Sequence, residues 1–421
     1  MDFDRTIERR GTNCEKWDLL KEIFGREDLL PFWVADMDFE TPEPVKEALK
    51  KRVEHGVFGY SYPGERLSEL IVERMRKKYG WHIEKEWIVF TPGVVPALSL
   101  AVRSFACPGD EVILQSPVYY PFFSAIENSG CHVVNNELLL KNDRYHMNIE
   151  GLKACFLPKR GIMPVERRIK AMLLCNPHNP AGRVWEKREL EEAGRIVTDN
   201  GAVVISDEIH CEIILKGRHV PFSSLRDFEQ SSMVCMSGSK TFNLAGLSTS
   251  FAIIPQDDMR KKFVAMKSHL VPDPNVLGLT ALEAAFESCD EWLEELLSYI
   301  RENLSYLRDF CARRMPGVRV IEPEGTYMVW LDFRVLKMSD AELRDLLIDG
   351  GVALDDGYLF GSGGSGFERM NIACPRALLE EGLEKMAKAL EKRRAMLSKI
   401  PDRSVAVKRV GSNKLKRYEN G

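Results

Sequence analysis

Short apolar runs alternate with helical repeats through the first two-thirds of the chain. Runs at 87–90, 111–114, 170–175, 202–206 and 233–236 have the length and composition of buried strands. Between them, apolar residues recur every three or four positions, which is the spacing of a helix face. Mostly apolar strands that alternate with helices indicate a parallel sheet covered on both faces.

The pattern changes near residue 290. A long amphipathic helix is predicted for Trp292–Arg314, short strands follow around 318–321 and 327–333, and a final helix covers 378–396. This order is typical of a separate α+β unit.

The length of 421 residues exceeds what one ordinary core supports, so we expect an α/β protein with two domains. The last segment carries seven lysines and arginines against two acids and lacks apolar periodicity, so we expect it to be mobile. The expected units are an N-terminal arm that forms part of the small domain (1–45), a large domain with a mostly parallel sheet (46–285), the small C-terminal domain (286–396) and a basic tail (397–421).

The composition narrows the range of partners. Apolar residues make up 44% and charged residues 29%, as in soluble globular proteins, and the net charge of -4 gives no electrostatic case for binding nucleic acid or an anionic membrane. The chain has no run of eighteen apolar residues and starts without an apolar signal core, so we expect a cytoplasmic location. Ten scattered cysteines without a C-x-x-C pair indicate reduced, mostly buried thiols and no metal site.

Polar or aromatic residues follow the C-terminal ends of four predicted strands. They are Tyr119, Asn179, Asp207 and Lys240. Ligands of open parallel sheets bind outside the carboxyl ends of the strands. We therefore expect these four side chains to share one site.

Lys240 follows a turn of small residues, Ser237-Gly238-Ser239. Small residues allow the backbone to approach a bulky ligand, and the two hydroxyls can bind an anion. A partly desolvated lysine has a lowered pKa and becomes a Schiff-base nucleophile. The alternative is an ordinary surface lysine, but the neighbouring strand ends favour the first interpretation.

A second anion site is predicted where the strand at 87–90 meets a helix. Gly93 makes the turn, and Val94 and Val95 begin the helix, whose free N–H groups and dipole attract an anion. Two other stretches each allow two interpretations. The apolar segment 31–39 with its two acids is either a buried connection or a wall of the site, and the aromatic residues at 119–123 either stack on a flat ring or pack in the core.

Three segments in this order resemble the fold-type I pyridoxal-phosphate enzymes of the class I/II aminotransferase group: Asn-Pro-Ala-Gly at 179–182, Asp-Glu-Ile-His at 207–210 and Ser-Gly-Ser-Lys at 237–240. The resemblance covers roughly residues 1–395. Within the group, the segments 31–39, 58–60 and 240–247 are similar to the cystathionine β-lyase/cysteine-S-conjugate β-lyase (MalY/PatB-type) branch.

The resemblance implies pyridoxal 5'-phosphate as cofactor and a role for each matching residue. Lys240 would carry the cofactor and move the Cα proton, and Asp207 would pair with the protonated pyridine nitrogen. For His210, a contact with the ring 3-oxygen and a capping or core role are equally open. The other implied positions are Asn179 at the ring 3-oxygen, Tyr119 stacked on the ring, Val94, Val95, Ser237 and Ser239 at the phosphate, Tyr60 at the phosphate of a neighbouring subunit, Arg369 at the substrate α-carboxylate, and Trp33, Val34, Ala35 and Tyr327 along the pocket.

The implied protein is a homodimer with shared active sites and an amino-acid substrate. The implied reaction is β-elimination from cystathionine or another L-cysteine S-conjugate, which gives a thiol, pyruvate and ammonia. An aminotransferase would use the same residues, and a regulator that binds a protein partner is a further alternative. One departure is that Ser248 and Thr249 stand where many relatives have a phosphate-binding arginine.

Overall fold

The computed structural model describes residues 2–157 and 169–397. Seven strands form a sheet in the order β2-β10-β9-β8-β7-β3-β4. β10 is antiparallel to both of its neighbours and the other pairs are parallel, which confirms the predicted α/β class with a mostly parallel sheet. The strands are β2 (Ile88–Thr91), β3 (Glu111–Leu114), β4 (His132–Asn135), β7 (Ile169–Cys175), β8 (Val203–Asp207), β9 (Ser232–Met236) and β10 (Ser250–Ile253).

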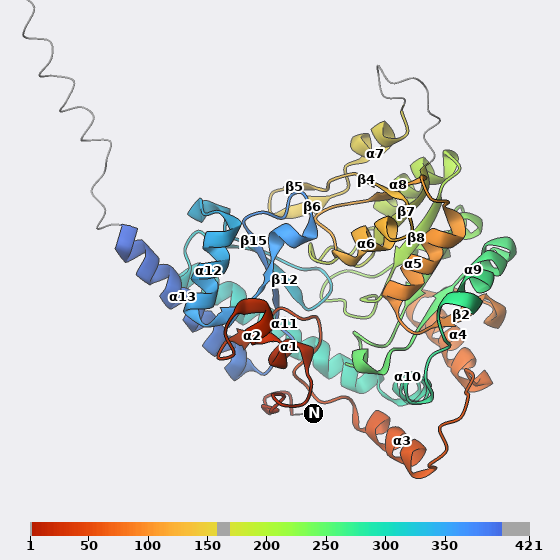
Figure 1. Ribbon diagram of the computed structural model, residues 1–421, viewed down its shortest axis with the longest axis horizontal. Coiled ribbons are helices and arrows are strands. Elements are labelled where there is room, and N and C mark those ends of the chain that lie inside the picture. The colour runs from red at the N-terminus through yellow and green to blue at the C-terminus, as the bar shows by residue number, and fades with distance from the viewer. Residues whose placement is uncertain (1, 158–168, 398–421) are drawn as a thin grey trace, which may run out of the picture.

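Helices cover both faces of this sheet (Figure 1). Along β3 the buried side chains alternate between two apolar clusters: Ile113 joins one, whereas Val112 and Leu114 join the other. This alternation follows from the two-residue period of a strand. The surrounding helices are α4 (Glu65–Tyr79), α5 (Val94–Phe105), α6 (Pro121–Glu127), α7 (Ile149–Cys155), α8 (Lys187–Asp199), α9 (Asp257–Leu270) and α10 (Val276–Ser288).

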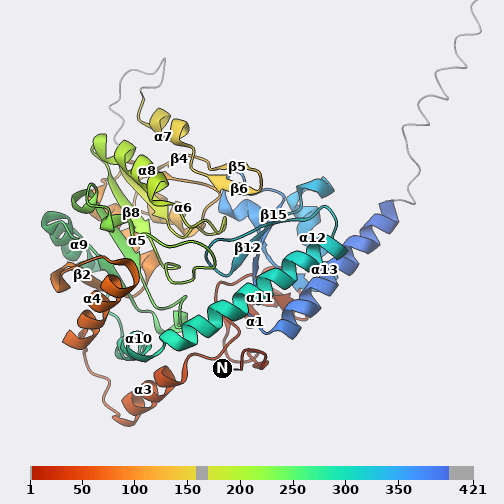
Figure 2. The ribbon, with the colours of Figure 1, turned by 180° about the vertical axis from the view of Figure 1, so that it is seen from behind.

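A second, antiparallel sheet lies in the C-terminal part of the chain, in the order β11-β12-β15-β14. Seen from behind, α11 and α13 run side by side next to it (Figure 2). The elements are β11 (Arg319–Ile321), β12 (Met328–Asp332), β14 (Asp355–Asp356), β15 (Phe367–Asn371), α11 (Asp290–Arg314), α12 (Asp340–Gly350) and α13 (Arg376–Leu397).

The N-terminal arm joins this C-terminal part. After α1 (Glu15–Asp18) and α2 (Leu20–Phe24), the two residues of β1 (Leu30–Pro31) pair in parallel with β13 (Val352–Ala353). The expected domain boundaries stay predictions, and that at 285/286 falls inside α10. Apart from residue 397, the expected basic tail lies outside the described residues.

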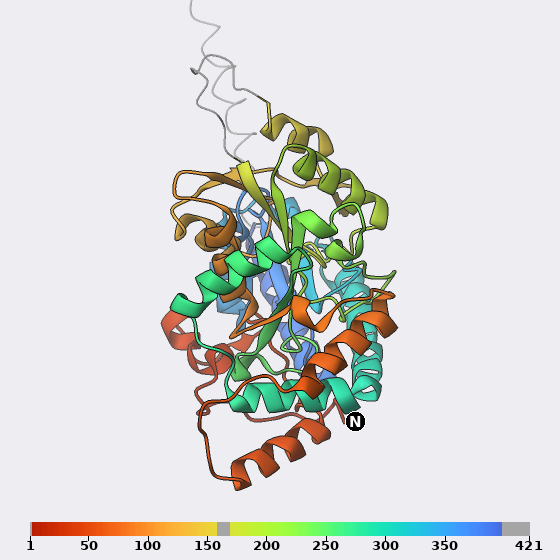
Figure 3. The same cartoon turned by 90° about the vertical axis from the view of Figure 1, so that its right-hand side faces the viewer.

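The helix α3 (Glu43–Glu54) lies at one edge of the molecule and packs along α10 (Figure 3). The segment 55–64 that follows it has no regular structure. No helix in the described ranges combines the length and apolar character that crossing a bilayer requires. All ten cysteines are free thiols, and seven of them are buried.

Among the elements that were not predicted from the sequence, two are hairpin-like features of the large part of the chain. One is β10, which returns antiparallel beside β9 directly after the Lys240 loop. The other is the hairpin of β5 (Leu139–Lys141) and β6 (Arg144–His146), whose turn residues Asn142 and Asp143 both have positive φ. Such a pair is typical of the tight turns that join antiparallel strands.

Candidate active site

The site lies where β7, β8 and β9 end side by side. Because these strands are parallel neighbours, the residues after their C-terminal ends meet at one sheet edge. They line a cavity of ≈ 190 Å³. Of the predicted site residues, the cavity brings together Ala35, Val94, Val95, Tyr119, Asn179, Asp207, His210, Ser237, Ser239 and Lys240.

The Lys240 amine points to the backbone of the N-terminal arm. Its Nζ donates a hydrogen bond to the Ala35 carbonyl oxygen at 2.6 Å, and the Tyr327 hydroxyl donates to the same oxygen at 3.1 Å. Burial lowers the pKa of Lys240 to about 8, although the nearby Asp36 carboxylate acts in the opposite direction. A substantial fraction of the amine is therefore neutral near physiological pH and able to act as a nucleophile.

Asp207 is a buried carboxylate at the end of β8. Its Oδ1 accepts a hydrogen bond from the Ile209 N–H at 3.1 Å, and within the described residues it forms no ion pair. Burial raises its pKa to about 7, with Glu208 adding to the rise and Lys240 opposing it. A cationic group opposite this carboxylate would keep it ionised, and a protonated pyridine nitrogen is such a group.

His210 lines the same cavity as Asp207. Its Nδ1 is buried without a hydrogen-bond partner in the described part of the chain, and its ring meets Tyr327 edge-on at 6.0 Å. Burial lowers its pKa to about 3, and the cations Lys240 and Arg369 lower it further. The imidazole is therefore neutral, and its contact with a ring oxygen stays a prediction.

One end of the cavity presents donors suited to a phosphate group. Val94 and Val95 begin α5 directly after Gly93, so their N–H groups belong to an open helix terminus. The hydroxyls of Ser237 and Ser239 lie 2.8 Å apart at the same cavity. Ser248 and Thr249 also line this cavity, so the two positions that depart from the arginine of many relatives present hydroxyls to it.

Arg369 lies on β15 with its guanidinium almost fully buried. Nη1 donates to Asn179 Oδ1 at 3.1 Å, Nη2 donates to the Trp33 carbonyl at 2.7 Å, and Nη2 lies 2.5 Å from Asp355 Oδ2. Nε is buried without a partner among the described residues. The guanidinium thus keeps N–H capacity for a ligand oxygen.

Trp33 meets Arg369 through its carbonyl and not through its ring. The indole Nε1 donates to the Lys16 carbonyl at 3.0 Å, and the ring packs edge-on against Phe24 at 5.6 Å. The predicted contribution of this residue to the pocket is therefore made by backbone.

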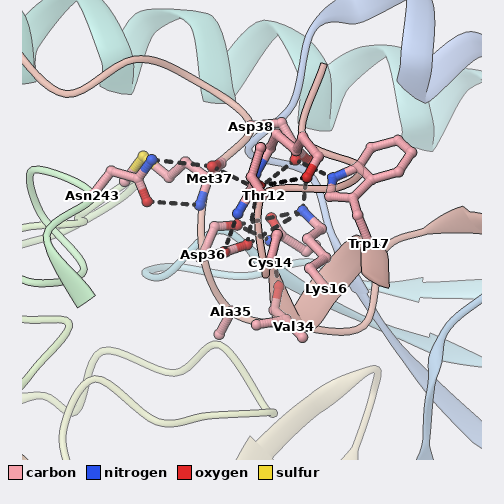
Figure 4. Close-up of polar contacts among 12 residues, drawn as sticks. Thr12, Cys14, Lys16, Trp17, Val34, Ala35, Asp36, Met37, Asp38 and Asn243 are labelled. Carbon is pink, nitrogen blue, oxygen red and sulfur yellow. Dashed lines mark hydrogen bonds and ion pairs between the residues drawn. The ribbon is translucent and has the colours of Figure 1, made fainter. Parts of the chain in front are cut away.

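The segment 34–39 forms a wall beside Lys240, whose Nζ donates to the Ala35 carbonyl. Figure 4 shows Val34–Asp38 of this wall with Lys16 and Trp17 of the arm. Asp38 accepts hydrogen bonds from Lys16 Nζ at 2.5 Å, Arg9 Nη1 at 2.6 Å and Trp17 Nε1 at 3.0 Å. Arg9 Nη2 also lies 2.5 Å from Asp36 Oδ2. Both acids of the wall are thus engaged within the chain. Ala35 lines the cavity and Met37, Asp38 and Phe39 are buried, so the segment is a buried connection that reaches the site at Ala35.

Two asparagines that the sequence did not single out fix the wall backbone. Asn243, whose φ is 58°, exchanges hydrogen bonds with the Met37 N–H and carbonyl, both at 3.0 Å. Asn371 Nδ2 donates to the Val34 and Asp36 carbonyls at 2.7 and 2.5 Å. Asn371 stands two residues after Arg369 on one strand, and this spacing predicts a shared face.

Tyr60 has the most exposed side chain of the predicted site residues. It is fully exposed in the segment 55–64, where Phe58 and Tyr62 are also exposed. Its predicted contact is with a neighbouring subunit and stays a prediction.

The residues present fit pyridoxal phosphate. A helix terminus and hydroxyls suit the phosphate, an unpaired buried carboxylate suits the ring nitrogen, and a lysine of lowered pKa suits the aldehyde. The described residues contain no cluster of three or more His, Cys, Asp or Glu that could hold a metal ion.

This fold and site define a fold-type I pyridoxal-phosphate enzyme. The family model described as aminotransferase class I and II matches residues 27–386, and the chain belongs to this family. It is 42% identical to cystathionine β-lyase PatB of Bacillus subtilis over 93% of this chain and 100% of that protein. It is 34% identical to protein MalY of Escherichia coli over 92% of this chain and 98% of that protein.

Solved structures agree with this placement. Cystalysin from Treponema denticola, which contains a pyridoxal 5'-phosphate cofactor, is 36% identical, with a TM-score of 0.88 over 93% of this chain and 99% of that one. A pyridoxal-phosphate-bound C–S lyase from Staphylococcus hominis is 31% identical, with a TM-score of 0.84 over 93% of this chain and 98% of that one.

Proposed function

We propose that this chain is a pyridoxal-phosphate-dependent carbon–sulfur β-lyase that acts on cystathionine or another L-cysteine S-conjugate. The observation that carries the proposal is the identity of 42% with a cystathionine β-lyase along nearly the whole chain, combined with Lys240 and Asp207 at one cavity. The products are a thiol, pyruvate and ammonia.

The bound cofactor supplies an electron sink for negative charge at the substrate Cα. With the cofactor bound, Asp207 would pair with the ring nitrogen and stabilise its proton, and the donors at Val94, Val95 and the serine pair would hold the phosphate. Arg369 grips the α-carboxylate with its planar fork, which a lysine cannot reproduce.

Lys240 moves the proton of the reaction. Its amine, with a pKa lowered to about 8, takes the proton from Cα and leaves the bonding electron pair behind. The C–S bond at Cβ then breaks, and the sulfur departs with its electron pair as a thiolate. The unsaturated amino acid that is released takes up water and yields pyruvate and ammonia.

The wall at 34–39 suits a neutral thioether side chain. Arg9 of the arm contacts this wall. It is bound by both Asp36 and Asp38 and is therefore not free to receive a second substrate carboxylate. A buried carboxylate without a partner is costly, so a substrate whose side chain ends in a lone carboxylate is disfavoured here, whereas the distal carboxylate of cystathionine brings its own ammonium group.

We further propose a cytoplasmic homodimer with active sites shared between subunits. The exposed aromatic side chains of Phe58, Tyr60 and Tyr62 support a partner surface at the segment 55–64.

Two parallel incubations test the reaction type. Purified enzyme receives cystathionine in one, and an amino acid without a β-leaving group plus a keto-acid acceptor in the other. We expect pyruvate, ammonia and free thiol in the first and only slow amino transfer in the second, with Lys240→Ala as the inactive control. Fast amino transfer without thiol release from any cysteine conjugate would make the protein an aminotransferase.

A further inference from the structure

The buried acid Asp355 lies across from Arg369 on the neighbouring strand. β14 and β15 pair antiparallel, so that Asp355 stands opposite Arg369 and Asp356 stands opposite Glu368. The side chains of Asp355 and Arg369 are only 6% and 2% exposed, and Nη2 lies 2.5 Å from Oδ2. The cross-strand register therefore fixes this ion pair within the sheet.

Asp355 is one of three groups that contact the guanidinium, and it does so through an ion pair, whereas the other two accept hydrogen bonds. The other two are the Asn179 side chain and the Trp33 carbonyl, and each of the three comes from a different segment of the chain. Recognition of a carboxylate by two parallel N–H groups depends on the plane of the guanidinium. Removal of Asp355 would release one of the three contacts that set this plane.

The surroundings of Asp355 hold more acid than base. Asp355, Asp356 and Glu368 are buried carboxyl groups, and two guanidinium groups face them, Arg369 and Arg344, of which Arg344 is bonded to Asp356. Other titratable groups near this cluster are the phenols of Tyr119, Tyr120 and Tyr358 and the carboxyl of Asp340. A ligand carboxylate on Arg369 would add a fourth acid and no cation. Closely spaced buried carboxyl groups do not all stay ionised.

We propose that Asp355 is a positioning residue for Arg369 and takes up a proton when a carboxylate ligand binds to that guanidinium. The inference rests on the proposed role of Arg369 as the site of the substrate α-carboxylate. Burial raises the pKa of Asp355 to about 6 while Arg369 opposes the rise, so in the free enzyme this acid is mostly ionised near neutral pH. A second anion on the same guanidinium raises this pKa further. Burial also raises the pKa of Glu368, so Glu368 is the other carboxyl group of this cluster that a variant has to test.

The test measures how many protons the enzyme takes up when a ligand binds, and it does not depend on turnover. The probe is 3-(methylthio)propanoate, a thioether carboxylate without an amine, titrated calorimetrically into the holoenzyme at about pH 7 in two buffers of different ionisation enthalpy. We expect close to one proton taken up per ligand bound, and a dissociation constant that rises toward about tenfold per pH unit above about pH 6. Absence of proton uptake by the wild-type enzyme overturns the proposal without any variant.

Two variants assign the proton. Asp355→Asn should abolish the uptake and flatten the pH dependence of binding, and it should raise KM for a cysteine conjugate more than it lowers kcat. Glu368→Gln is the matched control, because it removes a buried carboxyl that does not contact Arg369, and it should keep the wild-type uptake. Undiminished uptake in Asp355→Asn would overturn the proposal.

Arg369→Lys separates this inference from the proposed function. If Arg369→Lys binds the probe as tightly as wild type, the carboxylate is held elsewhere and the role proposed for Arg369 is wrong. If Arg369→Lys weakens binding while Asp355→Asn keeps the proton uptake, only the inference about Asp355 is wrong.

Discussion

The charge of the Asp207 side chain depends on whether a cationic group lies opposite it. Its pKa of about 7 arises from burial, which Lys240 only partly offsets, and a pyridinium partner would hold the carboxylate ionised. We expect Asp207→Asn to lower kcat at least about 100-fold, equal to about 2.7 kcal/mol, because the amide does not stabilise the ring proton. Steady-state kinetics measure this, with the exposed Asp227→Asn as control. Near-normal turnover in Asp207→Asn would remove the residue from this role.

Lys240 is expected to be the point of covalent attachment for the cofactor. Its amine lies at the cavity and has a lowered pKa because of burial, whereas most other lysines are solvated. Borohydride treatment of the holoenzyme followed by peptide mapping should place the label on Lys240. A label on any other lysine would contradict the assignment.

Residues that follow strand ends were predictable, and residues that act through distant partners were not. Asn179, Asp207 and Lys240 could be placed together because the carboxyl ends of parallel strands share one edge. Asp355 and Asn243 carry no such signal, because their importance depends on β14 lying beside β15 and on the arm lying beside the Lys240 loop.

At the scale of elements, the arm and the wall are joined by buried charge. Burial alone would raise the pKa of Asp38, but Lys16 and Arg9 hold it below its ordinary value. The stability that this pairing contributes is therefore fully present above the ordinary pKa of about 3.9 and is lost as the pH falls through the lower pKa of the folded protein.

Asp38→Asn should destabilise the protein near neutral pH by about 3 kcal/mol, because it leaves Lys16 buried without its close carboxylate. Urea unfolding at several pH values measures this. The difference in free energy of unfolding between wild type and variant should shrink below about pH 4. A difference that stays constant down to the lowest accessible pH would mean that the ion pair does not contribute, and Asp227→Asn should show no difference at any pH.

The elements themselves were predicted unevenly. Long periodic stretches such as α11 were found with nearly correct bounds, whereas β10 was missed. β10 has four residues and follows a loop with two left-handed residues, Asn243 and Ser248, so local pattern alone does not distinguish it from a buried connection. Its pairing with both β2 and β9 decides its conformation.

At the scale of the whole molecule, the exposed aromatic segment predicts self-association. Tyr60 and Tyr62 are 113% and 82% exposed, which is unusual for a pair of aromatic residues unless a partner covers them. Sedimentation analysis should give about 96 kDa, twice the chain mass of 48.0 kDa.

Tyr60→Phe should keep this dimer and weaken cofactor retention, because it removes the hydroxyl proposed to reach the neighbouring phosphate. Dialysis of the loaded enzyme measures the retention, and Tyr62→Phe is the matched control. A monomer that retains cofactor tightly would contradict the shared site.

The pairing of β1 with β13 joins Leu30 to Val352, so β1 has no strand partner until synthesis has passed β13. The wall that receives the Lys240 amine follows β1 directly and is anchored by Asn371, near the end of β15. By contrast, β8 and β9, whose ends carry Asp207 and Lys240, have strand neighbours that all come from residues 169–253. Chains cut short before β13 would therefore carry the reactive lysine without the strand pairing and the Asn371 contacts that hold the wall beside it.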